Sequence, residues 1–351
     1  MTERDGGAWS NWSGNLSSKP ARLVHAQSEK EIQDLVRECR EHGRTLRVVG
    51  AGHSWTPVAQ TEDVLLSLEN LTGVVSCDRG AGTATVRGGT TLQERNLAFA
   101  NLGDVSKQTV AGAFGTGTHG TGPDFSNLSA LLVGGRLVDR TGEVRTLDAA
   151  TDPAPLHAAR VSLGSLGVFT ELEVDVRPTY KIHRREYCTC FEEFWPHVDD
   201  LVAENRNFDF YWYPRSDEVK LRLLNGPGGG TDERKLDYAE KVEDDTDWWH
   251  VTIPAHNDIG REFEEMEYAL DRADGTACFL AGTNRWPVST HGGGRTGTPR
   301  PDQRPHRPVR TAAGEGVRYR THFDETDHRP VVSPGHQTGS GRDALDDCVP
   351  R

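Results

Sequence analysis

Apolar residues recur at helical spacing in one early segment of the chain, residues 28–43. Ser28 and Glu31 form a capping-box pattern at its start, and Gly43 stands where glycine commonly ends a helix. The spacing therefore predicts a one-sided helix of about four turns. Its apolar face would consist of Ile32, Leu35, Val36 and Cys39.

Short apolar runs predict strands over much of the remaining chain. These runs are residues 45–50, 64–68, 73–76, 84–86, 128–138 and 143–147, followed by the alternating TELEVDV at 170–176 and the aromatic FDFYWY at 208–213. Two further segments, residues 88–102 and 262–271, have helical patterns. A domain boundary is expected near Arg177 and Pro178.

The strand predicted at 45–50 runs into a glycine-containing loop, VVGAGHSWTP at 48–57. Gly50 and Gly52 would let backbone N–H groups turn toward one point, as in loops that cradle a pyrophosphate, although a plain tight turn between strands has the same composition. The G-x-G-x-x-G fingerprint fails because Trp55 stands at the third glycine, and no Gly-Lys-Ser/Thr occurs. These absences disfavour nicotinamide and P-loop nucleotide sites.

A second small-residue stretch, TVAGAFGTGTHGTG at 109–122, has Gly, Ala or Thr at nearly every position. Here we expect backbone lying close against a ligand and no packed helix or strand.

Charge and cysteine usage exclude several classes of partner. The chain of 351 residues has 53 acidic against 40 basic residues and a net charge of -13, which would repel nucleic acid and anionic membranes. It has no apolar run long enough for a transmembrane helix and no signal-peptide layout, so a cytoplasmic protein is expected. The only close cysteine pair is C-T-C at Cys188 and Cys190, and we expect neither a metal site nor a disulfide framework.

Three motifs in order carry a family resemblance: VVGAGHSWTP at 48–57, TVAGAFGTGTHGTG at 109–122 and LGSLGVFTELEVDVRP at 163–178. Together they resemble the PCMH-type FAD-binding half of the vanillyl-alcohol oxidase family, in its sugar-lactone oxidase branch of L-gulonolactone, D-arabinono-1,4-lactone and alditol oxidases. The resemblance covers about residues 12–225 and implies an α+β fold. Its expected parts are an FAD-binding domain of two subdomains at 15–178, a partial substrate (cap) domain at 179–282 and a tail at 283–351.

The resemblance also implies a function and a set of FAD contacts. The expected activity is oxidation of a hydroxyl group of a sugar lactone or alditol with O2 as acceptor, and the alternatives are a dehydrogenase with another acceptor or an inactive flavin-binding fragment. His53 matches the histidine that binds the flavin covalently through its 8-methyl carbon, and Gly103 matches a small residue that leaves space for oxygen. The remaining residues would wrap the pyrophosphate, line the flavin or contact the adenine end: Gly50, Ala51, Gly52, Ser54, Trp55, Thr109, Gly112, Gly115, Thr116, Gly117, Thr118, His119 and Val168.

The likeness ends near Val288. In the family a Glu-x-Arg pair and a later basic residue assist the reaction, but Arg285, Trp286 and Pro287 lead here to Ser-Thr-His, so no catalytic residue is assigned. Residues 283–351 hold eight of the 18 prolines, one leucine and no isoleucine, which predicts disorder. A shift of reading frame near Val288 and a natural Pro/Arg-rich extension are both consistent with this composition.

Overall fold

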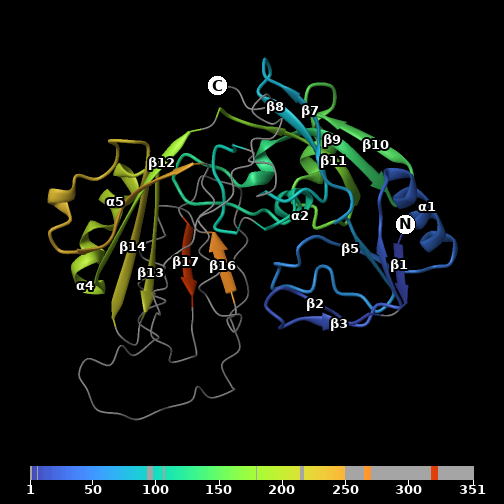
Figure 1. Ribbon diagram of the computed structural model, residues 1–351, viewed down its shortest axis with the longest axis horizontal. Coiled ribbons are helices and arrows are strands. Elements are labelled where there is room, and N and C mark those ends of the chain that lie inside the picture. The colour runs from blue at the N-terminus through green and yellow to red at the C-terminus, as the bar shows by residue number, and fades with distance from the viewer. Residues whose placement is uncertain are drawn as a thin grey trace, which may run out of the picture.

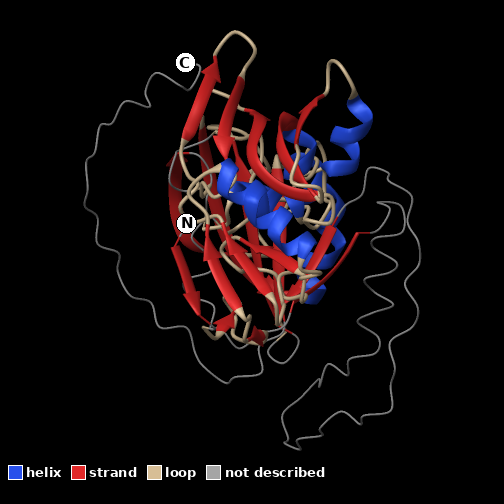
Figure 2. Cartoon of the chain, turned by 90° about the vertical axis from the view of Figure 1, so that its right-hand side faces the viewer, coloured by secondary structure: helices blue, strands red, loops and turns tan. Residues whose placement is uncertain are grey.

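The structure is a computed structural model that describes residues 2–5, 7–92, 98–105, 107–178, 180–213, 217–249, 265–269 and 318–322. Its α+β architecture contains three main sheets, which Figure 1 shows at the right, at the top and at the left. Strands form most of the regular structure, and the helices lie against the sheets (Figure 2).

The first sheet has the strand order β1-β4-β6-β5, with β4 and β5 parallel to the β6 strand between them. Helix α1 (Glu29–Glu41) buries the four predicted apolar residues, and the Ser28 hydroxyl accepts a hydrogen bond from the Glu31 N–H at 3.3 Å, so the predicted helix and cap are confirmed. The strands are β1 (Thr2–Asp5), β4 (Arg22–His25), β5 (Leu46–Val49) and β6 (Val64–Ser67). Between β1 and β4 the chain forms a small hairpin of β2 (Trp9–Ser10) and β3 (Ser17–Ser18).

The second sheet is antiparallel, in the order β10-β9-β11-β8-β7. Its apolar face packs on short helices in a core that includes Phe99, Phe114 and Leu172. All its strands had been predicted, with ends displaced by a few residues. The elements are β7 (Val74–Asp78), β8 (Thr83–Arg87), α2 (Val110–Gly115), η1 (Leu128–Leu131), β9 (Leu132–Asp139), β10 (Val144–Asp148), α3 (Pro153–Ala159) and β11 (Gly167–Asp175).

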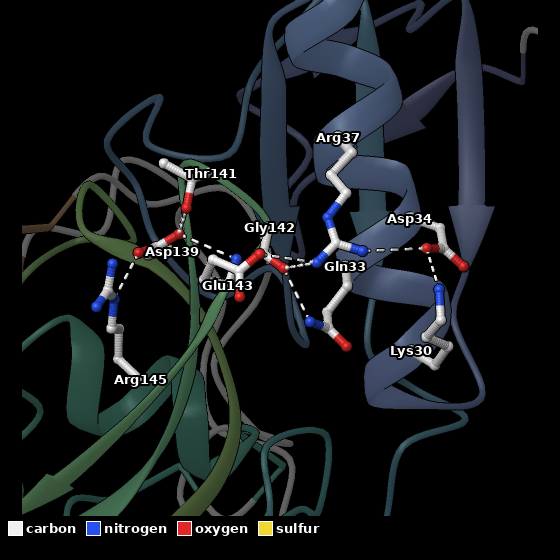
Figure 3. Close-up of polar contacts among 9 residues, drawn as sticks. All are labelled: Lys30, Gln33, Asp34, Arg37, Asp139, Thr141, Gly142, Glu143 and Arg145. Atoms are coloured by element: carbon white, nitrogen blue, oxygen red, sulfur yellow. Dashed lines mark hydrogen bonds and ion pairs between the residues drawn. The ribbon is translucent and has the colours of Figure 1, made fainter.

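Helix α1 is tied to the β9–β10 turn of the second sheet (Figure 3). The Gly142 carbonyl accepts hydrogen bonds from Gln33 Nε2 and Arg37 Nη2, both at 2.8 Å. Gly142 has a φ of +77°, and a Cβ there would lie 2.6 Å from Arg37 Cγ. Only glycine fits this turn without strain. The contact fixes the first sheet against the second.

Asp139 organises the same turn. Its Oδ1 accepts hydrogen bonds from the Thr141 N–H at 2.8 Å and the Thr141 hydroxyl at 2.6 Å, and its Oδ2 accepts from Arg145 Nε at 2.7 Å. Burial disfavours the charged carboxylate, but the donors from Thr141, Arg145 and the Glu143 backbone outweigh that effect and hold the pKa of Asp139 well below its usual range.

We expect Asp139→Asn to lower the free energy of unfolding by about 1–2 kcal/mol at pH 7. Because the folded pKa is depressed, the contribution of the carboxylate is fully present above about pH 5 and is lost as the pH falls toward the folded pKa. Urea unfolding of both proteins between pH 7 and pH 3 measures the difference. A gap that stays constant with pH would contradict the assignment, and Asp34→Asn, in the exposed Lys30 pair of Figure 3, should change stability by less than about 0.5 kcal/mol.

The third sheet begins with β12, and Arg177 and Pro178, where a domain boundary was predicted, lie between β11 and β12. Its order is β13-β14-β12-β15, and α4 and α5 pack on one face through a cluster that includes Phe194, Phe208 and Phe210. The predicted aromatic strand is confirmed as β13. The elements are β12 (Lys181–Cys190), α4 (Phe191–Phe194), η2 (Trp195–His197), α5 (Val198–Glu204), β13 (Asn207–Tyr213), β14 (Glu218–Asn225), η3 (Glu233–Lys235) and β15 (Glu240–Trp249).

Two local predictions were wrong. The stretch at 109–122 contains helix α2, because the Thr109 hydroxyl caps the Gly112 N–H and burial of Val110, Ala113 and Phe114 outweighs the poor helix propensity of glycine. The helix predicted within 88–102 falls largely on residues 93–97, which lie outside the described residues, and the described residues on either side are not helical. Within 262–271 the described residues form a strand, β16 (Glu265–Ala269). A segment this short can satisfy both the helical and the strand spacing of apolar residues, and pairing with another strand favours the strand.

Strand β16 pairs with β17 (Arg318–His322), so these five residues of the tail predicted to be disordered are in a strand. The rest of residues 283–351, with Val288 and the proposed change of frame, lies outside the described residues. None of the helices in the described part of the chain is long and apolar enough to cross a bilayer.

Candidate functional site

The glycine loop after β5 and the segment around α2 meet at one cavity of about 370 Å³. The loop supplies one wall, and residues before, within and after α2 supply the opposite wall. A smaller cavity of about 90 Å³ adjoins it and shares Gly50, Thr109, Gly112 and Thr116. Two segments that lie far apart in the sequence therefore face a single continuous space.

This space collects the residues predicted to contact FAD. Gly103, which was expected beside the flavin, also lines the larger cavity. Gly115 and Val168 line the smaller one. The other twelve predicted residues line the larger cavity: Gly50, Ala51, Gly52, His53, Ser54, Trp55, Thr109, Gly112, Thr116, Gly117, Thr118 and His119.

Close backbone approach explains the glycines of this site. A Cβ on Gly50 would lie 2.1 Å from Thr109 Oγ1, and one on Gly103 would lie 2.8 Å from the His119 carbonyl oxygen. Contacts of real Cβ atoms are longer than this, so a side chain at either position would force the two walls apart. Gly52 has a φ of +71°, which turns the loop at the residue before His53.

Several lining residues were not predicted from the sequence, among them Trp9, Asn11, Asp104, Gln108 and Leu163. Trp9 and Asn11 come from the N-terminal hairpin, and no local sequence pattern predicts their contact with a loop about 40 positions later. Asp104 and Gln108 lie between Gly103 and Thr109, both of which were predicted, so their position next to the motif was the available signal. Leu163 has a φ of +54° and is half exposed at the mouth.

Asp104 links the cavity to the third sheet. Its carboxylate accepts a hydrogen bond from Arg222 Nη2 at 3.0 Å, and Arg222 Nε donates to Asp209 at 2.6 Å. Arg222 is buried, and its guanidinium also lies 5.0 Å from the centre of the Tyr211 ring. Burial alone would lower the pKa of Arg222, but Asp209 and Asp104 more than offset it and raise that pKa well above its ordinary value.

The donor set of the cavity fits an FAD. Its lining residues within the described part of the chain include no Lys or Arg, so a pyrophosphate there would be bound by loop N–H groups, which the glycines leave accessible. Gln108 donates through Nε2 to Thr118 Oγ1 at 3.1 Å, while its buried Oε1 accepts no hydrogen bond from the described residues. A buried amide oxygen in that state suits a ligand with an N–H donor, which a flavin ring has. The described residues contain no cluster of acidic, histidine or cysteine side chains that could bind a metal ion.

Comparison with known proteins supports this assignment. Residues 20–148 match the family model described as FAD binding domain. The chain is 36% identical over 224 residues to an L-gulono-1,4-lactone dehydrogenase from Mycobacterium tuberculosis (strain ATCC 25618 / H37Rv), covering 62% of this chain and 52% of the relative. It is 32% identical over 254 residues to a D-arabinono-1,4-lactone oxidase from Eremothecium gossypii, covering 69% of this chain and 46% of the relative. The chain thus spans about half the length of the curated relatives it matches.

Solved structures agree on the fold. The Physcomitrella patens BBE-like 1 protein aligns with a TM-score of 0.58 and 20% identity, over 66% of this chain and 56% of that one. An alkyldihydroxyacetonephosphate synthase aligns with a TM-score of 0.61 and 13% identity, over 78% and 63% respectively. At these identities the likeness concerns the arrangement of helices and strands alone.

Proposed function

We propose that this chain is an FAD-dependent oxidoreductase acting on a hydroxyl group of a sugar lactone or alditol, because residues 20–148 match the FAD binding domain model and the chain is similar to sugar-lactone oxidases and dehydrogenases. The observation that carries the proposal is the meeting of the three motifs at one cavity, with glycine backbone on both walls. Dioxygen is the proposed electron acceptor. The proposed organisation is an FAD-binding domain at 15–178 followed by a substrate domain that begins at 179.

Each wall of the cavity has a role in holding the cofactor. The loop from Gly50 to Trp55 would surround the pyrophosphate with N–H groups. Gly103 and the small residues from Gly112 to His119 would lie along the flavin ring, and Val168 would contact the adenine end. His53 would hold the flavin covalently through its 8-methyl carbon, since a neutral imidazole has a nucleophilic nitrogen at cellular pH.

When bound, FAD would supply a two-electron acceptor for oxidation of the hydroxyl group. The overall reaction converts the alcohol and O2 to a carbonyl compound and H2O2. Within this chain, the walls of the cavity would orient the ring and exclude water from it. The Arg222 contact to Asp104 would hold the third sheet beside the flavin end, which is where a substrate would be covered.

A second candidate is a dehydrogenase that passes electrons to a carrier other than O2. The mycobacterial relative with 36% identity bears that activity in its name, which is the observation that favours this alternative. Gly103 was expected to leave space for dioxygen, but the His119 carbonyl fills the place that its side chain would take, so Gly103 does not decide between the two candidates.

Purified full-length protein tests the proposal. We expect yellow protein with bound FAD, with the colour retained in the acid-precipitated pellet, and H2O2 formed with at least one member of a panel of sugar lactones and alditols. Reduction of an artificial acceptor without H2O2 would identify a dehydrogenase. Protein that binds FAD but oxidises no member with either acceptor would identify an inactive flavin-binding chain, and protein that cannot take up FAD would disprove the proposal.

A further inference from the structure

The N-terminal hairpin holds the backbone on both sides of His53. The Trp12 N–H donates to the Gly52 carbonyl at 2.8 Å, and the Asn11 side-chain amide donates to the Ser54 carbonyl at 3.0 Å. The residues before and after His53 are therefore each fixed by a hydrogen bond from the same dipeptide. Such bonds restrict the backbone that carries the imidazole.

Trp12 also contacts the imidazole itself. The centres of the Trp12 and His53 rings are 5.2 Å apart, with 31° between their planes. The Trp55 ring lies against the same indole edge-on, with a centre distance of 6.2 Å. An aromatic ring packed against the imidazole limits the side-chain torsions of His53.

Asn11 is itself rigid, so it can transmit this restraint. Its side chain is buried, at 4% exposure. The Leu16 N–H donates to Asn11 Oδ1 at 3.0 Å, and Asn11 Nδ2 donates to Asn15 Oδ1 at 2.7 Å in addition to the Ser54 carbonyl. Both ends of the amide are thus used, which fixes its orientation.

We propose that Asn11 and Trp12 are positioning residues that hold the His53 imidazole in the orientation needed for its bond to the flavin. The inference rests on the proposed covalent attachment at His53. Forming that C–N bond removes one hydrogen from the 8-methyl carbon and one from the imidazole nitrogen, and the two electrons and two protons pass to dioxygen. A small misalignment slows such a step strongly, by up to about a hundredfold for a displacement of about 1 Å.

The role is separate from binding of FAD. Asn11 and Trp9 line the same cavity as the pyrophosphate loop, but the hydrogen bonds of this dipeptide go to loop carbonyl groups, and leave the loop N–H groups to the cofactor. Loss of the indole should therefore slow attachment of the flavin far more than it weakens uptake.

The test measures the flavin that stays with acid-precipitated full-length protein, as purified and during incubation with added FAD. We expect Trp12→Ala to attach flavin about tenfold more slowly than the wild type while total bound flavin, released plus retained, changes by less than about threefold. Trp12→Phe should restore most of the rate because it keeps a flat ring. Trp12→Leu keeps apolar bulk and the backbone N–H but should remain slow.

Two controls define the range. Ser17→Ala changes an exposed side chain in the same hairpin, on the strand β3 that pairs with β2, and it should attach flavin at the wild-type rate. His53→Ala should retain no flavin in the pellet. The thermal unfolding midpoint of each variant, with FAD present, identifies loss of fold.

The outcomes separate the two proposals. A wild type with flavin in the pellet and Trp12→Ala and Trp12→Leu variants that attach it at the same rate would overturn the positioning role and leave the proposed function intact. A wild type that binds FAD but releases all of it in acid would overturn the covalent attachment, and the positioning role with it. Should Trp12→Ala not fold, the difference between Trp12→Phe and Trp12→Leu decides.

Discussion

Replacing Arg222 with methionine is expected to lower the free energy of unfolding by about 3–5 kcal/mol, because it leaves two carboxylates facing each other without a cation in a mostly buried setting. Asp104 and Asp209 have side-chain exposures of 20% and 16%, and Arg222 has 6%. Position 222 and Asp209 stand directly opposite each other on β14 and β13. The strand pairing therefore keeps Asp209 in place in the variant, so that it cannot move away from Asp104. Urea unfolding at pH 7 measures the loss.

The repulsion also has a pH dependence. Without the guanidinium the pKa of each remaining carboxylate should rise, so the deficit of Arg222→Met should shrink as the pH falls from 7 to 4. The triple variant Arg222→Met, Asp104→Asn, Asp209→Asn should recover much of the stability, because no charge is left unpaired. Arg234→Met, which breaks an exposed pair with Asp232, is the control and should leave the urea unfolding midpoint almost unchanged.

If the triple variant is as unstable as Arg222→Met alone, the loss comes from missing packing of the arginine stem and not from charge. Flavin content is a second quantity that should change in these variants. Because Asp104 lines the cavity, variants that detach it from the third sheet should bind FAD more weakly than Arg234→Met does.

The elements that the sequence predicted well are those with a local cause. Helix α1 follows from its apolar spacing and from a cap three residues away, and the antiparallel strands follow from short apolar runs between turns. In the glycine loop, Gly52 has such a local cause, because its φ of +71° favours glycine. These signals lie within a dozen residues and need no knowledge of the partners.

Contacts between distant residues were beyond such local patterns. Asp104 and Arg222 are 118 positions apart, and nothing in either neighbourhood marks which carboxylate the arginine will meet. Asn11 and Ser54 are 43 positions apart, and their bond depends on how the hairpin lies on the loop. Helix α2 was not predicted for the same reason, since its stability comes from burying Phe114 in the core and not from its own composition.

Gly50→Ala is the second large effect that we expect, with a loss of about 1–3 kcal/mol of stability from overpacking. The new Cβ would lie 2.1 Å from Thr109 Oγ1, so the pyrophosphate loop and the start of α2 must separate. Flavin content should fall at least about tenfold, as the displaced N–H groups no longer converge on the pyrophosphate. Gly226→Ala is the matched control, because a Cβ there meets nothing within 4 Å and Gly226 does not line the cavity, and it should leave both quantities nearly unchanged.

A second substitution decides whether the clash is the cause. Thr109→Ala removes Oγ1 and leaves the closest remaining contact of the new Cβ at 3.2 Å, which a small shift accommodates. Alone it should cost about 1 kcal/mol, since Oγ1 caps the Gly112 N–H. The double variant should therefore lose at least about 1 kcal/mol less stability than the sum of the two single-variant losses, and it should recover part of the flavin content. Strict additivity would mean that Gly50 is required for a reason other than contact with Thr109, and the close approach of the two walls would then not explain the glycine.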